Sequence, residues 1–414
     1  MEFHCSNHKS IKEKVTFSMI AGSDTTSEEF LKTYGNLRVL RSAIIYGANG
    51  SGKSNFISAL SFMRDLGGEV RLRAAVRFRR KRTFMRDLVS NSMRYQPGQQ
   101  IIQMGHKLCS EKVPSKYEIQ FVRNEVRYAY GFSIRGNAIL DEYLYYFPKG
   151  RQVKIFERVG LEIKAGDRYK SLFDLSISVL KENRLFLSCA ANYSSRKEIE
   201  EAFLFFNTDL VIYNSEKNDW IEYSIQLMQN NKAMKKKFMN ILQALGTGIQ
   251  EIHLSDQSKS KADANAKVVY DRFEVDLMTE ESAGIKRLFQ MICPMLDILD
   301  TGKVLICDEL ENSLHESVIS QVVQMFQTYA KEPFAQLIFT THDTSLLDTD
   351  LFRRDQVWFT QLNQERATDL YSLVEIRNVR KTENLEKGYV SGKYGAIPML
   401  NKQFFHELEE SMKG

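Results

Sequence analysis

The stretch Val39-Leu40-Arg41-Ser42-Ala43-Ile44-Ile45-Tyr46, followed directly by Gly47-Ala48-Asn49-Gly50-Ser51-Gly52-Lys53-Ser54, decides the fold of this chain. Its first half is mostly apolar and β-prone, which predicts a short buried strand ending at Gly47. Beyond the glycines, apolar residues recur at helical spacing, at Phe56, Ile57, Leu60 and Met63. The second half matches G-x-x-x-x-G-K-[ST] and lies between the predicted strand and helix. That context is the one a phosphate-binding loop requires.

The chemistry of such a loop assigns roles to several of its residues. Its glycines let successive backbone N–H groups turn inward around phosphates, and the helix N-terminus adds positive potential. Lys53 would reach the β and γ phosphates, and Ser54 would ligate Mg²⁺. The other predicted ATP contacts are Asn49, Gly50, Gly52 and Asn55. The position of the loop disfavours the alternative of a chance glycine-rich turn, so the sequence predicts ATP and Mg²⁺ as ligands.

A second element is the apolar run Val304 to Cys307, which ends in two carboxylates, Asp308 and Glu309. A buried parallel strand would deliver Asp308 to the sheet edge beside the phosphate-binding loop, where it would hold Mg²⁺ directly or through water. Glu309 would then orient and deprotonate an attacking water. Taken alone, an acidic pair after a strand is more often a helix N-cap. The phosphate-binding loop favours the catalytic interpretation.

A third element is His342, which follows another apolar run, Gln336 to Thr340. It lies 34 residues after Asp308, one strand later, and can therefore reach the same sheet edge. There it would hydrogen-bond the γ-phosphate or the attacking water. A lone histidine is usually structural, but this placement favours a catalytic role.

These three elements together resemble the ABC/SMC superfamily of ATPases, in which a histidine follows the carboxylate-bearing strand called Walker B. The resemblance spans most of the chain. It implies an α/β P-loop NTPase fold with an ABC/SMC-like head, made of a mixed sheet core, an antiparallel β meander and a helical insert. It also implies that ATP is enclosed between two copies of the head. We therefore expect a dimer or a higher homo-oligomer.

The resemblance predicts a fourth element, the signature motif that contacts the γ-phosphate of nucleotide bound to the opposite subunit. Glu280 to Phe289 looks like a divergent version of it, with Ser282 and Gly284 as the contacting residues. Ser282 can cap a helix and leave its first N–H groups for a phosphate, although an ordinary cap is the alternative. The glutamine of the Q-loop has no clear counterpart, and Asn192 is the nearest candidate.

The rest of the chain is organised around these motifs. Three aromatic and β-branched runs separated by turn residues predict an antiparallel meander, at 117–122, 126–134 and 139–147. A helical, charged pattern follows, and then a polar stretch that predicts a mobile loop, at 194–245 and 255–267 respectively. We therefore divide the chain into the N-terminal half of the head, the helical insert with its loop, and the C-terminal half of the head, at 1–190, 191–267 and 268–414.

The spacing of the motifs narrows the resemblance. Asp308 follows Lys53 by 255 residues, more than a compact transporter ATPase domain needs and far less than the coiled-coil arms of SMC or RecN proteins require. The chain is similar to stand-alone ATPases of bacterial anti-phage and abortive-infection systems, namely RloA, AbiL-type proteins, PtuA and the PARIS ATPase. Three stretches carry this likeness: an opening strand with His8 in place of the usual aromatic, the Walker B region, and a C-terminal signature, at 7–11, 308–315 and 392–398.

Bulk properties set limits on location and partners. The formal net charge of +5 is modest for 48 kDa and does not by itself argue for a nucleic-acid partner. No stretch approaches the roughly 18 apolar residues of a membrane span, and the first residues lack a secretion signal. We expect a cytoplasmic protein without a membrane partner. Five widely spaced cysteines predict reduced thiols rather than disulfides or a zinc site.

One segment carries a dense basic charge. Seven of the twelve residues from Arg71 to Arg82 are Arg or Lys. They lie inside an insert, 67–88, that ends in a repeat of the pentapeptide Phe62 to Leu66. The insert is either a solvated surface excursion or a contact for a nucleic-acid backbone or a protein partner.

The family resemblance implies an ATP-hydrolysing sensor or scaffold of an anti-phage system. The roughly seventy residues after His342 are too few for the TOPRIM nuclease domain of related proteins, so we expect a separately encoded toxic effector such as a nuclease. Two alternatives stay open. A RecF-like DNA repair ATPase would bind duplex DNA, and a nucleotide-locked scaffold would show little turnover. The intact Glu309 disfavours the scaffold.

Overall fold

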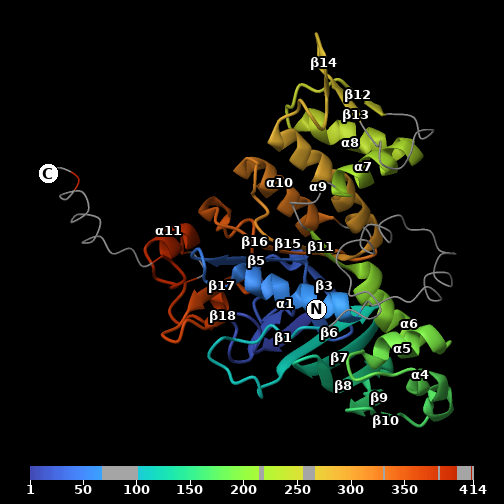
Figure 1. The fold of residues 1–414 in the computed structure, drawn as a ribbon. Helices are drawn as coiled ribbons and strands as arrows, with labels where there is room; N and C mark the ends of the chain where they lie inside the picture. Colours follow the sequence, from blue (N-terminus) through green and yellow to red (C-terminus); the bar gives the residue numbers. More distant parts are fainter. Residues whose placement is uncertain are drawn as a thin grey trace.

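The computed structural model describes residues 1–67, 101–213, 219–254, 266–329, 332–380, 383–398 and 412. Within this part, the chain forms three tiers: a seven-stranded antiparallel sheet, a six-stranded mixed sheet, and an arm of helices with a small sheet (Figure 1). The basic run 71–82 and all but the first residue of the insert 67–88 lie outside the described residues. Residues 255–265 of the predicted polar loop also lie outside them.

The six-stranded sheet forms the middle tier. Its order is β11 (Leu210–Tyr213), β15 (Val304–Cys307), β16 (Gln336–Thr340), β5 (Ser42–Gly47), β17 (Val357–Leu362) and β18 (Thr368–Ser372). The first five strands are parallel, and β18 runs antiparallel to β17. Every residue of β5, β15 and β16 is buried, as expected for parallel strands covered on both faces. The α/β fold class is thereby confirmed, and the carboxyl ends of these three strands share one edge.

The strand before the phosphate-binding loop differs from the sequence prediction. Instead of one strand from Val39 to Tyr46, the chain forms β4 (Leu37–Leu40), paired with β3 (Leu31–Tyr34), and then β5. Arg41 lies at the break. Its guanidinium stacks over the Phe334 ring at 4.8 Å and donates to the Tyr329 carbonyl at 2.9 Å. These contacts hold the bend that redirects the chain into the central sheet.

The predicted helical stretch 194–245 is also interrupted. It contains α6 (Lys197–Leu204), β11, α7 (Asp219–Asn230) and α8 (Lys232–Ala244). The four β-prone residues Leu-Val-Ile-Tyr of β11 pair with β15 as an edge strand of the central sheet. Burial against a neighbouring strand outweighs the helical pattern on either side.

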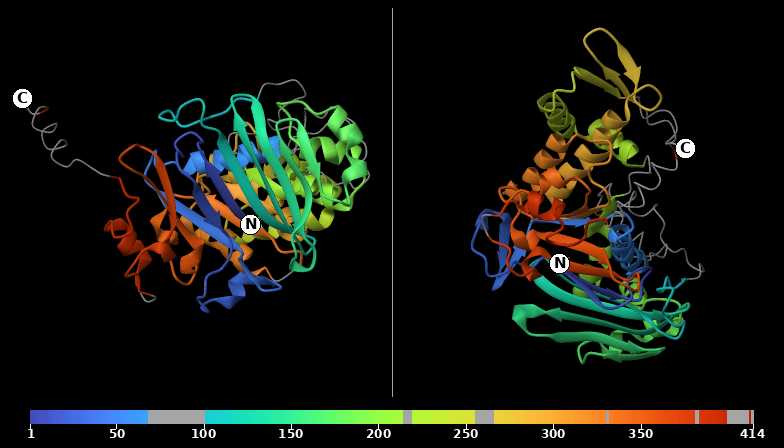
Figure 2. Two further views of the ribbon diagram at one scale, coloured as in Figure 1. Left: turned by 90° about the horizontal axis from the view of Figure 1, so that it is seen from below. Right: turned by 90° about the vertical axis from the view of Figure 1, so that its left-hand side faces the viewer.

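The lower tier is a sheet in the order β10 (Glu162–Ala165), β9 (Val153–Val159), β8 (Ala138–Phe147), β7 (Val126–Arg135), β6 (Ser115–Arg123), β1 (Glu2–Ser6) and β2 (Val15–Ser18). The predicted meander is confirmed in β6, β7 and β8. Helix α1 (Lys53–Gly67) lies between this sheet and the central one, as Figures 1 and 2 show. Its Phe56 ring packs against Phe3 and Phe17, with ring centroids 5.8 Å and 5.3 Å apart. The helix after the phosphate-binding loop thus joins the two sheets in one core.

Short helices α4 (Asp174–Ser178) and α5 (Phe186–Tyr193) lie beside the β8–β10 end of the lower sheet. A buried ion pair fixes this corner. Glu142 on β8 accepts the backbone N–H groups of Phe186 and Leu187 at 2.6 Å and 2.9 Å, and pairs with Arg158 on β9 at 3.3 Å. Burial raises the pKa of Glu142, and the charge of Arg158 opposes that rise. The start of α5 is therefore fixed to the sheet.

The arm contains α7, α8, α9 (Ala283–Thr301) and a sheet of β12 (Glu251–Leu254), β13 (Ala266–Val269) and β14 (Glu274–Asp276). It has its own hydrophobic cluster, in which the Phe238 and Phe289 rings lie 4.8 Å apart. Helices α10 (Glu316–Thr328) and α11 (Leu385–Val390) contribute to the core on the arm side of the central sheet. Single 3₁₀ or π turns lie at 28–30, 148–150, 170–172, 205–209, 344–346, 354–356 and 373–375.

All five cysteines are free thiols, and four of them are buried, which agrees with the expectation of reduced cysteines. Among the described residues, no helix is both long and apolar enough to span a bilayer.

His8 is a buried titratable group in the turn between β1 and β2. Its Nδ1 lies 2.7 Å from the Tyr117 hydroxyl, and its Nε2 lies 3.2 Å from Oγ of Ser58 on α1. Burial, together with the nearby charge of Lys9, lowers the pKa of His8 to about 3. The imidazole is therefore neutral in the folded protein at any pH near neutrality.

Substitution of His8→Phe should remove part of the acid sensitivity of folding. In the unfolded chain His8 titrates near pH 6.5, so the unfolded state binds the extra proton as the pH falls. The free energy of unfolding of the wild type should fall by about 2 kcal/mol from this group between pH 7 and pH 5. Urea denaturation at both pH values should show a smaller drop for His8→Phe. An equal drop in the wild type and in His8→Phe would contradict the assignment.

Candidate nucleotide-binding site

The phosphate-binding loop connects β5 to α1 and requires glycine at defined positions. Gly50 and Gly52 have positive φ values of 77° and 107°, a region that side chains with a Cβ rarely adopt. At Gly52 an added Cβ would also lie only 2.0 Å from Oγ1 of Thr368 on β18. The glycines therefore allow both the turn of the loop and its close approach to the neighbouring strand.

Hydroxyl groups from the C-terminal half of the chain hold the loop in place. Oγ1 of Thr360 lies 2.6 Å from Oγ of Ser51, and Thr368 Oγ1 donates to the Ser51 carbonyl at 2.9 Å. Thr368 Oγ1 also lies 2.7 Å from Oγ of Ser10, which accepts the Asn55 side-chain amide at 2.7 Å. The N-terminal stretch 7–11 thus lies beside the loop. It forms a turn with positive φ at Asn7 and at residue 9, and not the opening strand that the resemblance implied.

Lys53 is the buried cation of the site. Only 5% of its surface is exposed, and its Nζ donates to the carbonyls of Gly47 at 2.7 Å and Ala48 at 3.3 Å. Burial lowers its pKa, while the carboxylates of Asp308, Glu309 and Glu311 oppose that shift. These carboxylates are therefore close enough to act on the ammonium. Ser54 lies next along α1 and is exposed to solvent.

One hydroxyl group holds the Asp308 carboxylate and the backbone of Glu309. Thr340, at the end of β16, donates its Oγ1–H to Oδ1 of Asp308 at 2.6 Å. Oγ1 of Thr340 also accepts the backbone N–H of Glu309, at 2.8 Å. Glu309 itself has a φ of +50°, a strained backbone conformation for a residue with a side chain. The sequence analysis did not identify Thr340, although its place at the end of the strand beside β15 was a usable signal.

His342 lies beside Glu309. Its Nε2 is 3.9 Å from Oε1 of Glu309, and both side chains are partly exposed, at 39% and 52%. Its backbone N–H donates to Oε1 of Glu311 at 2.6 Å. The other oxygen of Glu311 is buried and has no hydrogen-bond partner among the described residues. A carboxylate oxygen without a donor, on a residue close enough to act on Lys53, suits a site that takes up a hydrated Mg²⁺. The sequence analysis did not identify Glu311.

The predicted signature residues lie at the start of α9. Ser282 is the N-cap of this helix, and its Oγ accepts the N–H of Ile285 at 3.2 Å, as the sequence predicted. Ser282 is exposed. Gly284 approaches the loop after β15, where an added Cβ would lie 3.3 Å from the Ser313 carbonyl. Among the described residues, no hydrogen bond joins Ser282 or Gly284 to the phosphate-binding loop of the same chain.

Arg287, five residues after Ser282 on α9, is a further residue that the sequence analysis did not identify. It is 97% buried, and its guanidinium stacks on the ring of Tyr213, 4.5 Å from the centroid, and donates to the Tyr213 hydroxyl. Its Nη2 donates to the backbone carbonyl of Glu309 at 3.4 Å. An arginine among the apolar residues Leu288 and Phe289 was the available signal. The first two turns of α9 thus approach the Walker B loop at its beginning, the Glu309 carbonyl, and near its end, the Ser313 carbonyl.

Asn192, the candidate Q-loop residue, lies in the last turn of α5. Its side-chain amide donates to the Ser188 carbonyl one turn earlier, at 2.6 Å. No hydrogen bond found within the described ranges joins it to the phosphate-binding loop. Its role therefore stays a prediction.

The glycine loop, the lysine of α1, and the carboxylates and histidine at one edge of a parallel sheet define a P-loop nucleotide-binding head. The family model described as "AAA domain, putative AbiEii toxin, Type IV TA system" matches residues 42–348. The chain therefore belongs to this family.

Solved structures also align over most of the chain. One is an SMC head domain from Thermotoga maritima, at 12% identity and a TM-score of 0.43, and another is an SmcHead bound to the C-winged helix domain of ScpA, at 15% and 0.41. In each case the alignment covers 90% of this chain and 97% of the other. The search of curated proteins found no match.

Proposed function

We propose that the protein binds and hydrolyses MgATP in sites shared between two copies of the head. One observation carries the proposal. Lys53 after β5, Asp308 and Glu309 after β15, and His342 after β16 meet at one edge of the central sheet. Each group suits a different part of phosphoryl transfer to water. Membership of an AAA-domain family supports the same activity.

The side chains divide the chemistry among them. The loop N–H groups and Lys53 would bind the β and γ phosphates, and Ser54 and Asp308 would hold the Mg²⁺ that neutralises developing charge. Glu309 would take the proton of the attacking water, and His342, 3.9 Å from its carboxylate, would donate a hydrogen bond to the water or the γ-phosphate. Thr340 would keep the Asp308 carboxylate and the backbone of Glu309 in position through its two hydrogen bonds.

Ser282 and Gly284 would complete the site of a second copy. They lie at the exposed N-terminus of a 19-residue helix, where backbone N–H groups and the helix dipole attract a phosphate. This arrangement needs a dimer in which each signature helix faces the phosphate-binding loop of its partner. ATP would then stabilise the closed dimer because it contacts both copies.

In the cell, we propose a sensor or scaffold role in anti-phage defence, related to that of RloA, AbiL-type proteins, PtuA and the PARIS ATPase. ATP turnover would control a separate toxic effector, such as a nuclease. The family description, which names a putative toxin of a type IV TA system, supports a defence setting. The alternative is a RecF-like DNA repair ATPase. It rests on the basic run 71–82, which lies outside the described residues, and it requires DNA binding that weakens steeply with salt.

Substitution of Glu309→Gln should trap a closed dimer. The amide cannot accept the proton of the attacking water, so bound ATP persists and holds two copies together. Light scattering after gel filtration with MgATP should show a stable dimer, and phosphate release should fall by about 10²-fold or more. Glu316→Gln, on the exposed first turn of α10, is the matched control and should behave as wild type. A nucleotide-locked scaffold would instead show the same assembly in all three proteins.

Two inactive variants should restore activity when mixed. Lys53→Ala disables the phosphate-binding loop and Ser282→Arg blocks the signature, so each homodimer lacks both working sites. In a mixed dimer, one site combines an intact Lys53 with an intact Ser282. A 1:1 mixture should recover up to about a quarter of the wild-type rate by subunit statistics. If tagged co-purification shows that mixed dimers form but the mixture stays inactive, the proposal that the signature acts on the partner's nucleotide is wrong.

Replacement of Arg287 should lower turnover without weakening nucleotide binding. Arg287 contacts the Glu309 carbonyl and not the phosphate-binding loop, so Arg287→Met should reduce kcat about 10-fold or more through misplaced Glu309 and leave KM nearly unchanged. Arg287→Lys should recover part of the rate. Arg41→Met removes another stacked arginine, one that is distant in sequence from Glu309. It controls for a fall in kcat that comes only from a less stable fold. An equal kcat in Arg287→Met and Arg41→Met would show that Arg287 has only a structural role.

A further inference from the structure

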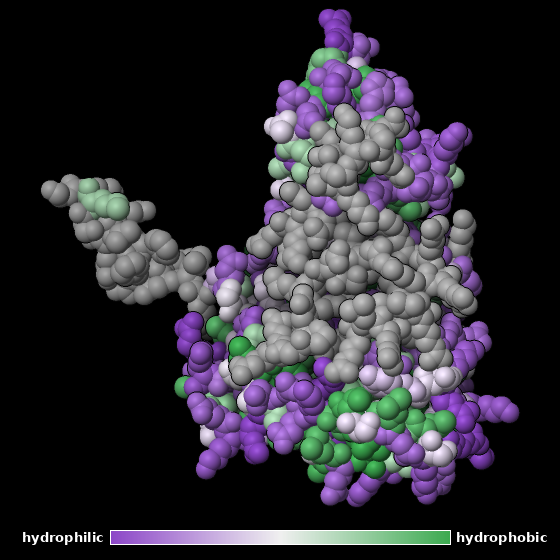
Figure 3. Space-filling view, turned by 45° about the vertical axis from the view of Figure 1, so that its right-hand side comes forward, coloured by the Kyte–Doolittle hydropathy of each residue, from purple (hydrophilic) through white to green (hydrophobic). Residues whose placement is uncertain are grey.

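An apolar surface lies at the β10 end of the lower sheet, away from the nucleotide site. Val159 and Leu161 at the β9–β10 turn expose 65% and 49% of their surfaces, and Leu175 and Ile177 on α4 expose 56% and 40%. Figure 3 shows apolar side chains gathered over this corner at the bottom of the view. Surface Leu and Ile are common as single residues, but several of them gathered on one corner mark a candidate interaction site.

The same corner carries the end of the lower sheet. Strand β10 pairs with β9 alone among the described strands, so its other edge presents backbone N–H and carbonyl groups to the surroundings. The hairpin that joins β9 to β10 turns at Gly160 and Leu161. An open edge beside apolar side chains is the arrangement that accepts an added strand from another chain.

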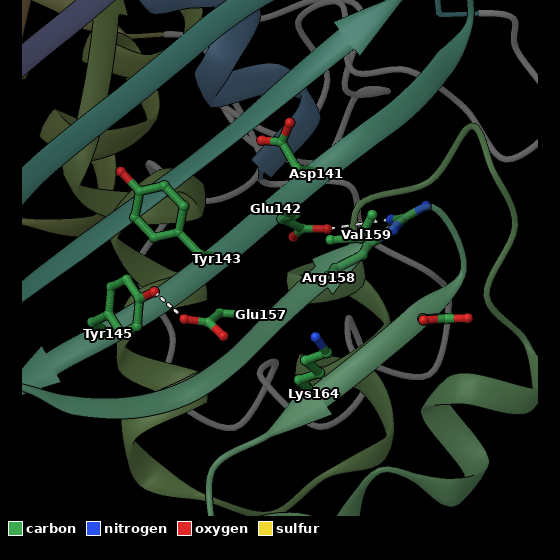
Figure 4. Close-up of a pocket in the computed structure, with 9 residues that line it drawn as sticks. Asp141, Glu142, Tyr143, Tyr145, Glu157, Arg158, Val159 and Lys164 are labelled. Atoms are coloured by element: carbon green, nitrogen blue, oxygen red, sulfur yellow. Dashed lines mark hydrogen bonds and ion pairs between the residues drawn. The ribbon is translucent and has the colours of Figure 1, made fainter.

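The outer face of this sheet arranges side chains in rows across three strands. One row is Asp141 on β8, Val159 on β9 and Glu162 on β10, and the next is Tyr143, Glu157 and Lys164. A cavity of about 370 Å³ lies over these rows and is lined by all six residues together with Glu142, Tyr145 and Arg158 (Figure 4). A strand added at β10 would extend both rows by one side chain each.

The first row ends in unbalanced negative charge. Asp141 and Glu162 form no ion pair with a Lys or Arg among the described residues, and Val159 between them is uncharged. Glu157 in the second row already pairs with Lys154 at 3.0 Å and accepts the Tyr145 hydroxyl. The side chain placed next to Glu162 by an added strand would therefore be favoured if it were basic.

The cavity itself is not built for a small ligand. The charged pair of Glu142 and Arg158 at its base is buried, and its hydrogen bonds go to the protein. Glu142 accepts from Phe186, Leu187 and Tyr130, while Arg158 donates to backbone carbonyls such as those of Gly160 and Lys181. The groups left for a partner are the open edge, the apolar side chains, and the carboxylates of Glu162 and Asp141, of which Asp141 accepts the Ser133 hydroxyl but has no basic partner among the described residues. They suit an extended peptide.

We propose that the open edge of β10 is a docking site for an extended segment of a different protein. The segment would pair with β10 as an eighth strand. Its apolar side chains would cover Leu161 and the exposed residues of α4, and a Lys or Arg would lie next to Glu162 in the row that begins at Asp141. Backbone hydrogen bonds would supply affinity, and the apolar and basic side chains would supply specificity. The site does not depend on ATP binding or hydrolysis.

Two synthetic peptides of alternating Val and Thr test the chemistry. In one, the central Thr is replaced by Lys, and in the other by Glu. Fluorescence anisotropy with the full chain should show binding of both, with the Lys peptide about 2- to 5-fold tighter, as cross-strand pairs predict. Glu162→Lys should invert that preference. Glu162 is exposed, so this variant should fold normally. A matched Glu111→Lys variant should keep the wild-type preference. Glu111 is also exposed, and it lies in the segment before β6, which three strands separate from β10 in the sheet.

Two further probes separate strand pairing from loose apolar contact. The Lys peptide with its internal amides N-methylated cannot donate backbone hydrogen bonds and should bind at least about 10-fold more weakly. Leu175→Ser with Ile177→Ser, both exposed positions, should weaken the unmodified peptide several-fold. Equal binding of the methylated peptide, or no change of preference in Glu162→Lys, would overturn the proposal. Self-association that Glu162→Lys abolishes in analytical ultracentrifugation would also overturn it, because the occupant would be a second copy.

Discussion

The buried ammonium of Lys53 is the charge on which the rest of the site depends. Burial of an unpaired cation costs several kcal/mol, so the structure must surround it with acceptors. The carbonyls of Gly47 and Ala48 accept its hydrogen bonds, and three carboxylates from the loop after β15 oppose the lowering of its pKa. The parallel order of β15, β16 and β5 brings these groups together from positions more than 250 residues apart. The protein alone thus surrounds the ammonium with carbonyls and carboxylates, and a triphosphate would add its own negative charge to these groups.

Most of this arrangement could be predicted because each candidate group follows an apolar strand, either directly or after a short loop. Parallel strands place their carboxyl ends at one edge, so the order strand, loop and polar residue specifies Lys53, Asp308 and His342 without knowledge of the contacts. Thr340, Glu311 and Arg287 could not be found in this way, since their roles depend on which strand or helix is the neighbour. The bend at Arg41 and the strand β11 were also missed. Stacking of Arg41 on Phe334 determines the bend, and pairing with β15 determines β11. Both contacts join residues that are distant in the sequence.

Helix α9 connects two parts of the proposed mechanism. Its first turn carries Ser282, which would contact the partner's nucleotide, and Arg287 a little over one turn later contacts the Glu309 carbonyl of its own site. Gly284 lies against Ser313 at the far end of the same loop. A helix is stiff over so short a distance, and its buried contacts are close-packed. Movement of the proposed signature on closure would therefore act directly on the backbone of Glu309, the proposed catalytic base.

Helix α1 connects the central and lower sheets, as α9 connects the proposed signature with the Walker B loop. Its N-terminus forms one side of the phosphate-binding loop, and its apolar face packs against both sheets in a single cluster. Because close-packed interiors resist deformation, the loop, α1 and the lower sheet should move as one body. The arm has a separate hydrophobic cluster and joins the body through α9 and β15. The β10 edge belongs to the body that holds the phosphate-binding loop, while the proposed signature at Ser282 lies on α9, on the arm side. A segment docked at β10 would thus stay fixed to the nucleotide while α9 responds to the partner.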